Sequence, residues 1–488
     1  MRLRRVLMVM PILFVGACLV GPTYRKPSAP VPQGYKEMPK EGTAAAVTWK
    51  AAQPNDEARR GKWWEIFRDP ELNSLEEEIS VSNQAIAVAE AQYRGARALV
   101  GNVRSALFPA VGVGPSVTRS SGGTVTQSPG SGQAAPAVTV YEVPVDLSWQ
   151  LDLFGRIRRS VQASLASAQA SAADLEGVRL AMHAELALDY FLLHGLDAEI
   201  ELLNKTAAGY RTTVEITESR FKQGVVSGVD VAQAKTQLNA TLAQATDLGI
   251  SRAQLEHALA VLVGKPPAEF SVPPAPIQVV LPEIPIGLPS ELLERRPDIA
   301  ASERQMAAAN AQIGVAMAGY FPTLSLSGDA GYAGSKLAGL FSLPNRLWSL
   351  GASLFETIFD GGQRSAVKRQ AVAAYDATVA GYRETVLTAF GQVEDNLAAL
   401  KILAGETQYQ GEAVAQAELA LKLANNRYMN GVTSYLEVVT AQTTALANEL
   451  LAVQLLTRQM TASVGLIEAL GGGWRSSDPV ASGPSPSR

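Results

Sequence analysis

Two long stretches of the sequence carry apolar or small residues at a helical spacing. From Val161 to Val214 such residues recur every three or four positions, at about 3.5 on average, which is typical of helices packed as in a coiled coil. Proline, which breaks helix interiors, is absent from 145–265 and from 345–478. A helix from Arg156 to about Lys222 would be roughly 100 Å long at ~1.5 Å per residue. This length exceeds what a globular core needs and favours a tube.

Shorter runs alternate between apolar and polar residues, which indicates strands with two different faces. The first run follows Phe108-Pro109, and a Gly/Ser-rich loop from about Ser120 to Ala135 separates it from the second. Alternation over about ten residues is the pattern of a transmembrane β-strand, although a two-sheet domain in water shares it. The apolar positions are Val111, Val113 and Val117; Val143, Val145, Leu147, Trp149 and Leu151; Leu324, Leu326, Ala330 and Tyr332; and Trp348, Leu350, Ala352 and Leu354.

The chain repeats itself. Residues Arg220–Val231 return 207 positions later as Arg427–Val438, with Arg, Gly, Val, Ser, an acid and Val in register. Leu107-Phe108-Pro109 is echoed by Tyr320-Phe321-Pro322, and Gly155-Arg156 by Gly362-Gln363-Arg364. Several matches in the same order indicate a structural duplication. Each copy is predicted to contain a helix, two strands and a long helical hairpin.

Both hairpins are predicted to turn at the repeated motif. Gly224 and Gly431 stand where a helix end favours a left-handed residue, and an arginine in the preceding turn complements the helix dipole. A serine, followed three residues later by an acid, has the spacing of a capping box for the returning helix. A capped turn explains the serines, whereas a functional role for Asp230 and Glu437 is equally compatible with the pattern. These residues are Arg220, Ser227 and Asp230 in the first copy, and Arg427, Ser434 and Glu437 in the second.

Four strands cannot close a sheet by themselves. Open sheet edges are not tolerated in lipid, so the chain is expected to share a barrel with copies of itself. Two copies would give a barrel of eight strands, and side chains fill the interior of a barrel of that size. Three copies would give twelve strands, which enclose an aqueous passage. We therefore expect a mainly α fold with transmembrane β: a homotrimer with a twelve-stranded β-barrel joined to an α-helical barrel.

The N-terminus resembles a bacterial lipoprotein signal. Arg2, Arg4 and Arg5 precede a short apolar run that ends in small residues before Cys18, the only cysteine. A lone cysteine at that place fits cleavage followed by attachment of a diacylglyceryl group and an acyl chain, and Leu19 in place of Asp permits sorting to the outer membrane. No later segment offers ~18 consecutive apolar residues for a transmembrane helix.

Composition excludes several other classes. The net charge is only −4 and no basic block is interleaved with aromatics, which argues against nucleic acid as a partner. The sequence holds none of the common catalytic or phosphate-binding motifs. His183, His194 and His257 are expected to be solvated helix residues rather than metal ligands. No catalytic site, metal site or cofactor is predicted.

These features divide the chain into six segments. Residues 1–17 form the signal peptide and 18–60 a lipidated, extended segment rich in Pro, Gly and Ala. The first structural repeat is expected at 61–270 and the second at 288–474, with a linker at 271–287. Residues 475–488 are expected to be a disordered tail.

The residues at this point resemble the outer-membrane efflux protein family of TolC and OprM type, in its NodT-like lipoprotein branch. The resemblance covers nearly all of the mature chain. It rests on both hairpin-tip motifs and on four further stretches: Cys18 to Tyr24, Trp63-Trp64 with Phe67 and Asp69-Pro70, Leu288 to Ile299, and Ala318 to Pro322.

The resemblance implies a channel that exports small molecules such as drugs or metal ions from the periplasm across the bacterial outer membrane. A periplasmic adaptor would grip the tips at Gly224, Val225, Gly431 and Val432 and couple the channel to an inner-membrane transporter of the RND type. Asp230 and Tyr428 match a pair that latches the closed tips, and Glu437 a ring of acids at the constriction. Thr440 and Thr433 replace an Asp and an Arg of relatives, which leaves the tightness of the gate and its ion selectivity open.

Two other functions share parts of this pattern. A duct for type I protein secretion has the same architecture and differs in its inner-membrane partner. A coiled-coil lipoprotein without a pore would have the helices, but strand alternation argues against it.

Overall fold

The structure is a computed structural model of the whole chain. It describes residues 19–29, 31–32, 34–37, 61–121, 137–277, 281–282, 284 and 295–472. Cys18, the signal peptide, most of the N-terminal segment, part of the linker and the tail therefore lie outside the described residues.

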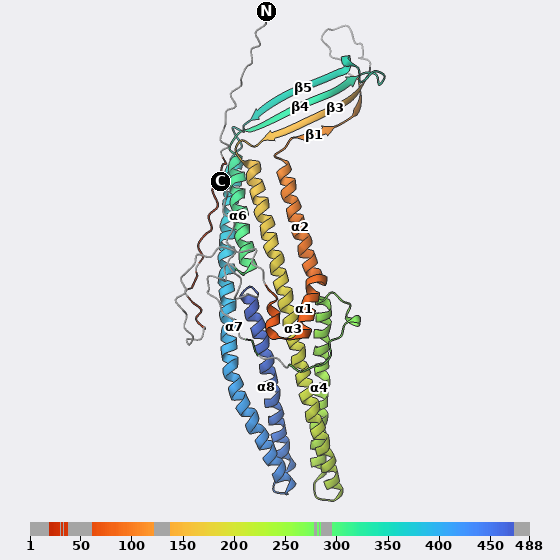
Figure 1. The fold of residues 1–488 in the computed structure, drawn as a ribbon, viewed down its shortest axis with the longest axis vertical. Helices are drawn as coiled ribbons and strands as arrows, with labels where there is room; N and C mark the ends of the chain where they lie inside the picture. The colour runs from red at the N-terminus through yellow and green to blue at the C-terminus, as the bar shows by residue number, and fades with distance from the viewer. Residues whose placement is uncertain are drawn as a thin grey trace, which may run out of the picture. The chain divides into compact units, whose positions relative to one another are not determined.

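The described elements occur in the same order twice (Figure 1). The first copy holds a helix pair, strands and a hairpin: η1 (Trp63–Phe67), α1 (Pro70–Ser82), α2 (Gln84–Ser105), β1 (Ala110–Val113), β2 (Ser116–Ser120), β3 (Val138–Leu151), α3 (Arg156–Lys222), α4 (Gly228–Leu262) and η2 (Pro267–Glu269). The second holds α6 (Pro297–Ala318), β4 (Thr323–Gly334), η3 (Leu343–Asn345), β5 (Arg346–Phe355), α7 (Gln363–Met429) and α8 (Tyr435–Ala469).

The two hairpins have equal arms. Helices α3 and α7 each contain 67 residues, and α4 and α8 each contain 35. The helix expected from Arg156 to about Lys222 is confirmed as α3. Because an uninterrupted helix rises ~1.5 Å per residue, each long arm extends about 100 Å.

The chain divides into two compact units. Unit 1 comprises Met1–Pro27, Tyr93–Ala170 and Ser302–Tyr382, and so contains the strands and the parts of α2, α3, α6 and α7 next to them. Unit 2 comprises Ser28–Gln92, Ser171–Ala301 and Arg383–Arg488, and contains both hairpin tips.

Unit 1 contains one antiparallel sheet with the order β1-β3-β4-β5, in which β2 also pairs with β3 (Figure 1). The single first strand predicted around Val111 to Thr118 is wrong in one respect, since the structure splits it at Gly114-Pro115 into β1 and β2. Pro115 has no backbone N–H for the ladder, which explains the break. Both pieces align with β3, at Val113↔Val145 and Ser116↔Glu142, so they serve as one edge.

Unit 2 has an aromatic and aliphatic core where the short N-terminal elements pack against the long helices. Trp63 and Trp64 meet edge to face with ring centroids 5.8 Å apart, and Phe67 lies 4.9 Å from Phe191 of α3. Close packing of this kind stabilises the unit by removing large apolar surfaces from water. The core includes Leu72, Leu75 and Ile79 of α1, Leu186 and Leu193 of α3, Leu259 of α4, and Met460, Val464 and Ile467 of α8.

Two of the three histidines contradict the prediction that they are solvated, because His183 and His194 are buried. The ring of His183 stacks on Trp64 at 4.6 Å, and its Nδ1 lies 2.5 Å from a carboxylate oxygen of the buried Glu76. Nδ1 of His194 donates to the carbonyl of Ala275 at 2.6 Å. Sequence periodicity did not reveal this burial because η1, α1 and the 270s segment cover that side of α3.

Helix α8 is apolar enough and long enough to cross a membrane by composition and length alone, and no other described helix is. Of its apolar window, 44% is buried inside the chain. Its apolar side supplies Met460, Val464 and Ile467 to the core of unit 2. The composition of α8 is therefore explained by packing.

Candidate functional site

The turn between α3 and α4 is a capped helical end of the predicted kind. Gly224 has φ +71°, and the backbone N–H of Val225 donates to the carbonyl of Arg220 at 2.9 Å. The predicted capping box is confirmed: the Ser227 hydroxyl accepts from the N–H of Asp230, whose carboxylate accepts from the N–H of Ser227 at 3.1 Å. This geometry holds the turn rigidly with local bonds.

The turn between α7 and α8 has the same backbone but different side-chain contacts. Gly431 has φ +73°, and Val432 N–H donates to the carbonyl of Arg427 at 2.9 Å. The capping box predicted for Ser434 is wrong, since its side chain caps no backbone group. Glu437 instead accepts from Arg427 Nη1 at 2.6 Å and from the Thr433 hydroxyl. An arginine and a hydroxyl outcompete one backbone N–H because a charge-assisted bond is stronger.

An aromatic cluster joins the ends of the two hairpins within unit 2. The buried rings of Tyr428 and Tyr435 lie 5.2 Å apart, and the guanidinium of Arg220 lies 4.9 Å from the Tyr428 centroid. Val214, Ala234, Ala424 and Val438 complete this cluster. The first hairpin therefore contributes a cation and the second hairpin the aromatic faces that it contacts.

The residues expected to form the gate all lie at these ends. The carboxylate of Asp230 accepts its hydrogen bond within the capping box, and the structure shows no hydrogen bond between Asp230 and Tyr428. The Tyr428 hydroxyl is buried without a hydrogen-bond partner among the described residues, and burial raises its pKa. The Thr440 hydroxyl donates to the carbonyl of Leu436 at 2.9 Å, one turn earlier in α8. The tips thus leave one buried donor unused at Tyr428.

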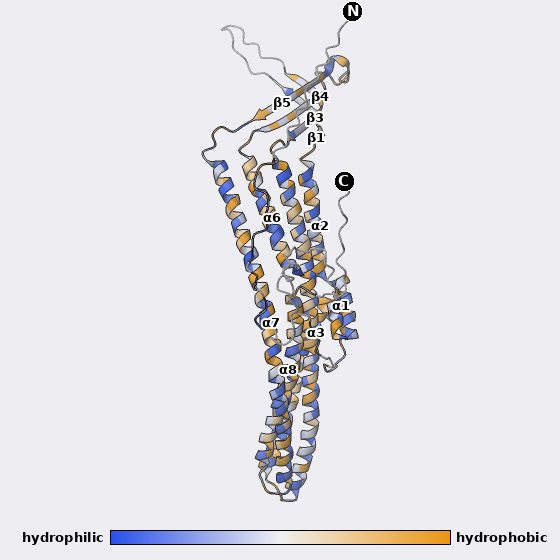
Figure 2. Cartoon of the chain, turned by 60° about the vertical axis from the view of Figure 1, so that its left-hand side comes forward, coloured by the Kyte–Doolittle hydropathy of each residue, from blue (hydrophilic) through white to orange (hydrophobic). Residues whose placement is uncertain are grey.

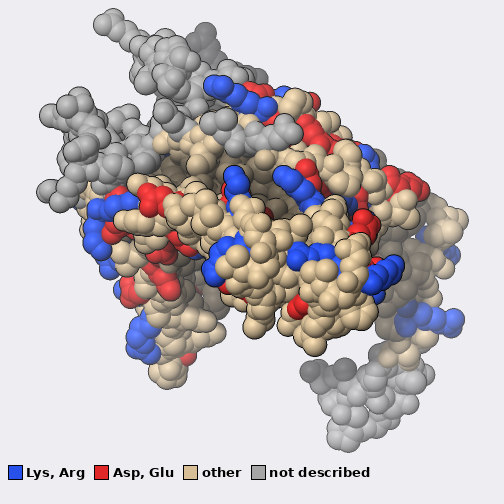
Figure 3. Space-filling model, turned by 90° about the horizontal axis from the view of Figure 1, so that it is seen from below, with Lys and Arg blue, Asp and Glu red and all other residues tan. Residues whose placement is uncertain are grey.

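The outer surface of the turns is partly apolar. The four residues expected to contact an adaptor lie in the turns, and Val225 and Val432 are 58% and 66% exposed. Figure 3 shows side chains of both signs on the face seen from below, interspersed with uncharged surface. Exposed valines beside paired charges suit a reversible protein contact.

The strands of unit 1 contain both hydrophobic and hydrophilic residues (Figure 2), and their register separates these residues onto two faces of the sheet. Its register places Leu147 opposite Gly328 and Gly328 opposite Leu350, so one face is apolar across three strands. Trp348, Leu350 and Leu354 of β5 are 68%, 81% and 66% exposed. On the other face, Asp146 is opposite Asp329, which accepts from the Ser349 hydroxyl at 2.7 Å. An apolar face this exposed is suited to lipid and not to water.

Both edges of this sheet are open in the single chain. β1 and β2 form one edge and β5 the other, and no described strand pairs with their outer sides. Such edges present unpaired N–H and C=O groups, which the hydrocarbon of a membrane does not tolerate.

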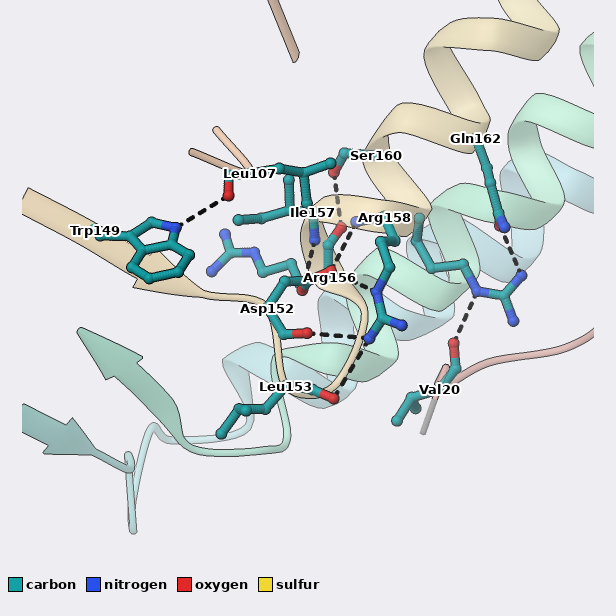
Figure 4. Close-up of polar contacts among 11 residues, drawn as sticks. Val20, Leu107, Trp149, Asp152, Leu153, Arg156, Ile157, Arg158, Ser160 and Gln162 are labelled. Carbon is teal, nitrogen blue, oxygen red and sulfur yellow. Dashed lines mark hydrogen bonds and ion pairs between the residues drawn. The ribbon is translucent and has the colours of Figure 1, made fainter. Parts of the chain in front are cut away.

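Each junction between a strand and a long helix is fixed by an aspartate that was not among the predicted site residues, and Figure 4 shows the junction at Asp152. Asp152 accepts from the N–H groups of Ile157 and Arg158 at 3.0 and 2.9 Å and from Arg158 Nε at 3.0 Å. Asp360 repeats this in the second copy, accepting from Arg364 N and Nε at 3.1 and 2.6 Å. The signal was present as an Asp a few residues before an Arg at both repeat positions. The long helix is thereby anchored to the strand that precedes it.

The N-terminal segment binds to unit 1 directly after Cys18. Arg159 is buried and donates to the carbonyls of Val20 and Gly21 at 2.9 and 3.0 Å. Gly21 has φ +103°, and a Cβ there would lie 2.5 Å from the Cα of Gly314. The hydroxyl of Tyr24 donates to Glu303 Oε1 at 2.6 Å. This part of the stretch from Cys18 to Tyr24 therefore has a shaped seat on α3 and α6.

A duplicated pair of long helical hairpins, attached to a sheet with a lipid-compatible face, defines a channel protein of the bacterial outer membrane. The sequence pattern described as outer membrane efflux protein matches residues 75–265 and 288–472, one match for each copy. The chain belongs to the outer membrane efflux protein family.

Relatives agree with this assignment. The chain is 32% identical to outer membrane protein OprJ of Pseudomonas aeruginosa over 468 residues, 95% of this chain and 94% of OprJ. It is 31% identical to the toluene efflux pump outer membrane protein TtgF of Pseudomonas putida, over 94% of this chain and 95% of TtgF.

Solved structures have the same fold. The outer-membrane channel OprN aligns with a TM-score of 0.81 and 33% identity, over 94% of this chain and 100% of the OprN chain. The outer membrane channel MtrE of Neisseria gonorrhoeae, in its open state, aligns with a TM-score of 0.79 and 26% identity, over 93% and 98%. The protein is an outer-membrane efflux channel component.

Proposed function

We propose that three copies of this chain form the exit duct of a tripartite efflux pump. The sheet carries the proposal, because it has an exposed apolar face and two open edges. Three copies pairing edge to edge supply a twelve-stranded barrel whose polar faces line a passage. The long hairpins continue that passage as an α-helical barrel in the periplasm.

Small molecules are the proposed cargo. The related proteins OprJ and TtgF are outer-membrane proteins, and TtgF is named for a toluene efflux pump. This likeness favours drugs, solvents or metal ions over secreted proteins as cargo of the present chain.

The proposed membrane attachment includes a lipid anchor on Cys18, with a diacylglyceryl group and an acyl chain. Its support is the seat for Leu19 to Tyr24, in which Arg159 holds two backbone carbonyls. A segment that is fixed immediately after the modified residue keeps the acyl chains close to the strands of unit 1.

The proposed partners are a periplasmic adaptor at the tips and an inner-membrane transporter of the RND type. Gly224, Val225, Gly431 and Val432 would form the adaptor contact, supported by the exposed valines in rigid turns. Opening then requires that the adaptor bind the open tips more tightly than the closed tips.

The gate is proposed to consist of Asp230, Tyr428, Glu437 and Thr440 from each subunit. Within one chain, Arg427 and Thr433 hold Glu437, and Arg220 covers Tyr428. A threefold ring of carboxylates in a narrow passage attracts cations, so Glu437 is the residue we expect to set selectivity.

The oligomer is tested on the full, lipid-anchored chain purified in detergent. We expect a mass of three protomers and ion conductance in planar bilayers. A monomer that passes no ions would refute the duct.

Substituting Glu437→Gln tests the gate. The change breaks the charged contact with Arg427, so we expect a higher single-channel conductance and a lower preference for cations over anions in a salt gradient. Glu412→Gln, an exposed neutralisation elsewhere on α7, serves as the control. Equal conductance and selectivity in both variants would remove Glu437 from the gate.

A further inference from the structure

Three exposed cations lie in unit 1 where the long helices begin. Arg156 is the first residue of α3, and Lys368 and Arg369 lie within the first two turns of α7. We call these three residues the collar. Neighbouring cations are already engaged: Arg158 pairs with Asp152, and Arg364 with Asp360 and Glu356. None of the collar residues forms an ion pair with an acid that the structure describes.

Helix stability does not explain the collar. The N-terminal end of a helix carries a partial positive charge, so cations there are unfavourable. The backbone donors at these ends are satisfied by Asp152 and Asp360. Arg104, in the last turn of α2, is different, because a cation at a helix C-terminus is favoured by the dipole.

The described start of the N-terminal segment packs next to Arg156. The N–H of Val20 donates to the carbonyl of Phe154 at 3.3 Å, and a Cβ on Gly155 would lie 2.5 Å from Leu19 Cδ1. Leu19 is therefore packed against the residue just before Arg156. The proposed lipid anchor is on the residue that precedes Leu19 in the sequence.

The α7 end of the collar has an independent marker. Phe355 ends β5, and Ile358 and Phe359 lie between β5 and α7; these residues are 66%, 95% and 87% exposed. Two cations follow these exposed apolar side chains within about ten residues. This arrangement is typical of the interface between the hydrocarbon and headgroup regions of a membrane.

We propose that the collar binds the phosphate groups of anionic phospholipids in the leaflet that holds the lipid anchor. The inference rests on the proposed anchor and on the membrane position of the sheet. Three cations without acidic partners complement phosphodiester charge, and guanidinium groups bind phosphate with paired N–H donors. The collar would thereby set the height of the channel in the membrane.

The test uses the full, lipid-anchored chain in detergent and native mass spectrometry. Phosphatidylglycerol is compared with phosphatidylcholine of the same acyl chains. We expect phosphatidylglycerol to bind about 100-fold more tightly, with about a fivefold loss for each of the three collar cations removed. Arg156→Gln with Lys368→Gln and Arg369→Gln should abolish the preference.

The control variant has the same change in net charge, but the three cations are removed from another part of the chain. Lys205→Gln with Arg211→Gln and Lys422→Gln removes three exposed cations of unit 2 and should retain the preference. Arg156→Lys with Arg369→Lys keeps the charges and should retain it too. If the collar and control variants lose the preference equally, or if neither loses it, the collar is not the lipid site.

Conductance separates this inference from the proposed duct. A wild-type protein that conducts as a trimer but shows no preference for phosphatidylglycerol would refute the collar alone. A collar variant with unchanged lipid binding and a shifted reversal potential would place these cations in the passage, which also refutes it. Absence of conductance in the wild-type trimer would refute the duct.

Discussion

Glu76 and His183 illustrate how burial sets the charge of single residues in unit 2. Burial lowers the pKa of His183 to about 4 and raises the pKa of Glu76 well above its usual value. Both shifts favour the uncharged form of the group concerned, and Nδ1 of His183 lies 2.5 Å from a carboxyl oxygen of Glu76. A neutral pair avoids the large cost of an ion pair inside a core.

We predict that Glu76→Gln makes stability less dependent on pH. Because the folded pKa of Glu76 is raised, the folded chain keeps a proton that the unfolded chain releases above about pH 4.5, and stability is lost as the pH rises. The variant lacks this loss, which amounts to at most about 1.4 kcal/mol per pH unit. Thermal unfolding followed by circular dichroism should show that the melting temperature of the variant, relative to wild type, increases as the pH rises above about 4.5.

His183, which contacts Glu76, contributes a slope of the opposite sign, so the comparison is made at pH values where that slope is absent. Its lowered pKa costs stability as the pH falls below the ordinary value of 6.5. Glu201→Gln, at an exposed position of α3, is the control. A constant difference between Glu76→Gln and wild type at all pH values would show that Glu76 is ionised when folded.

The strand–helix junctions stabilise the first turns of the long helices α3 and α7. Asp152 and Asp360 both accept backbone N–H groups at the start of a long helix and a guanidinium from its first turns. The side chain of Asp152 is 8% exposed and that of Asp360 is 13% exposed, so water competes little with these bonds.

Removing either aspartate should weaken its helix start. We expect Asp152→Ala to cost about 1–2 kcal/mol, the usual range for loss of a helix cap, Asp360→Ala to destabilise its helix start in the same direction, and the two losses to add in the double variant. The measurement is the melting temperature, followed by circular dichroism. Asp376→Ala, at an exposed position within α7, should leave it unchanged. A similar loss in this control would mean that the effect comes from net charge.

The two hairpin tips share a sequence motif but differ in their side-chain contacts. The same glycine, arginine, serine and acid pattern produces a capping box around Ser227, whereas Glu437 turns to Arg427 and Thr433. In the first hairpin Arg220 lies over the Tyr428 ring and leaves Asp230 to the backbone. A contact from the other hairpin therefore decided which local bond formed.

At the scale of the whole molecule, the exposed face of the sheet requires either lipid or a partner. We predict that Leu350→Lys destabilises the membrane-inserted protein by about 2–4 kcal/mol, the cost of a cation on the lipid face of a barrel near mid-membrane. Ser353→Lys lies on the polar face of the same strand and should be tolerated. Heat-modifiable migration of outer-membrane fractions measures insertion. Equal loss in both variants would argue that the face is buried by protein.

The duplication explains why so much of the architecture follows from residue order. Helix period, absence of proline and the repeated glycine motif predicted the ends of α3, and the second copy has arms of the same lengths. Strand alternation predicted which side chains share a face, because a period of two is a property of the extended chain itself. The break at Pro115 is also local, yet it was missed because the alternation continues across it.

Local sequence therefore determined the long helices, the two-faced strands, the capped turns and the family. Pairings between distant segments required the folded chain: the burial of His183 by η1 and α1, the seat of Leu19 to Tyr24 on Arg159, and the contact of Arg220 with Tyr428. Hydrophobic periodicity and secondary-structure propensity depend on a few neighbouring residues. These contacts join residues more than a hundred positions apart, and only packing brings them together.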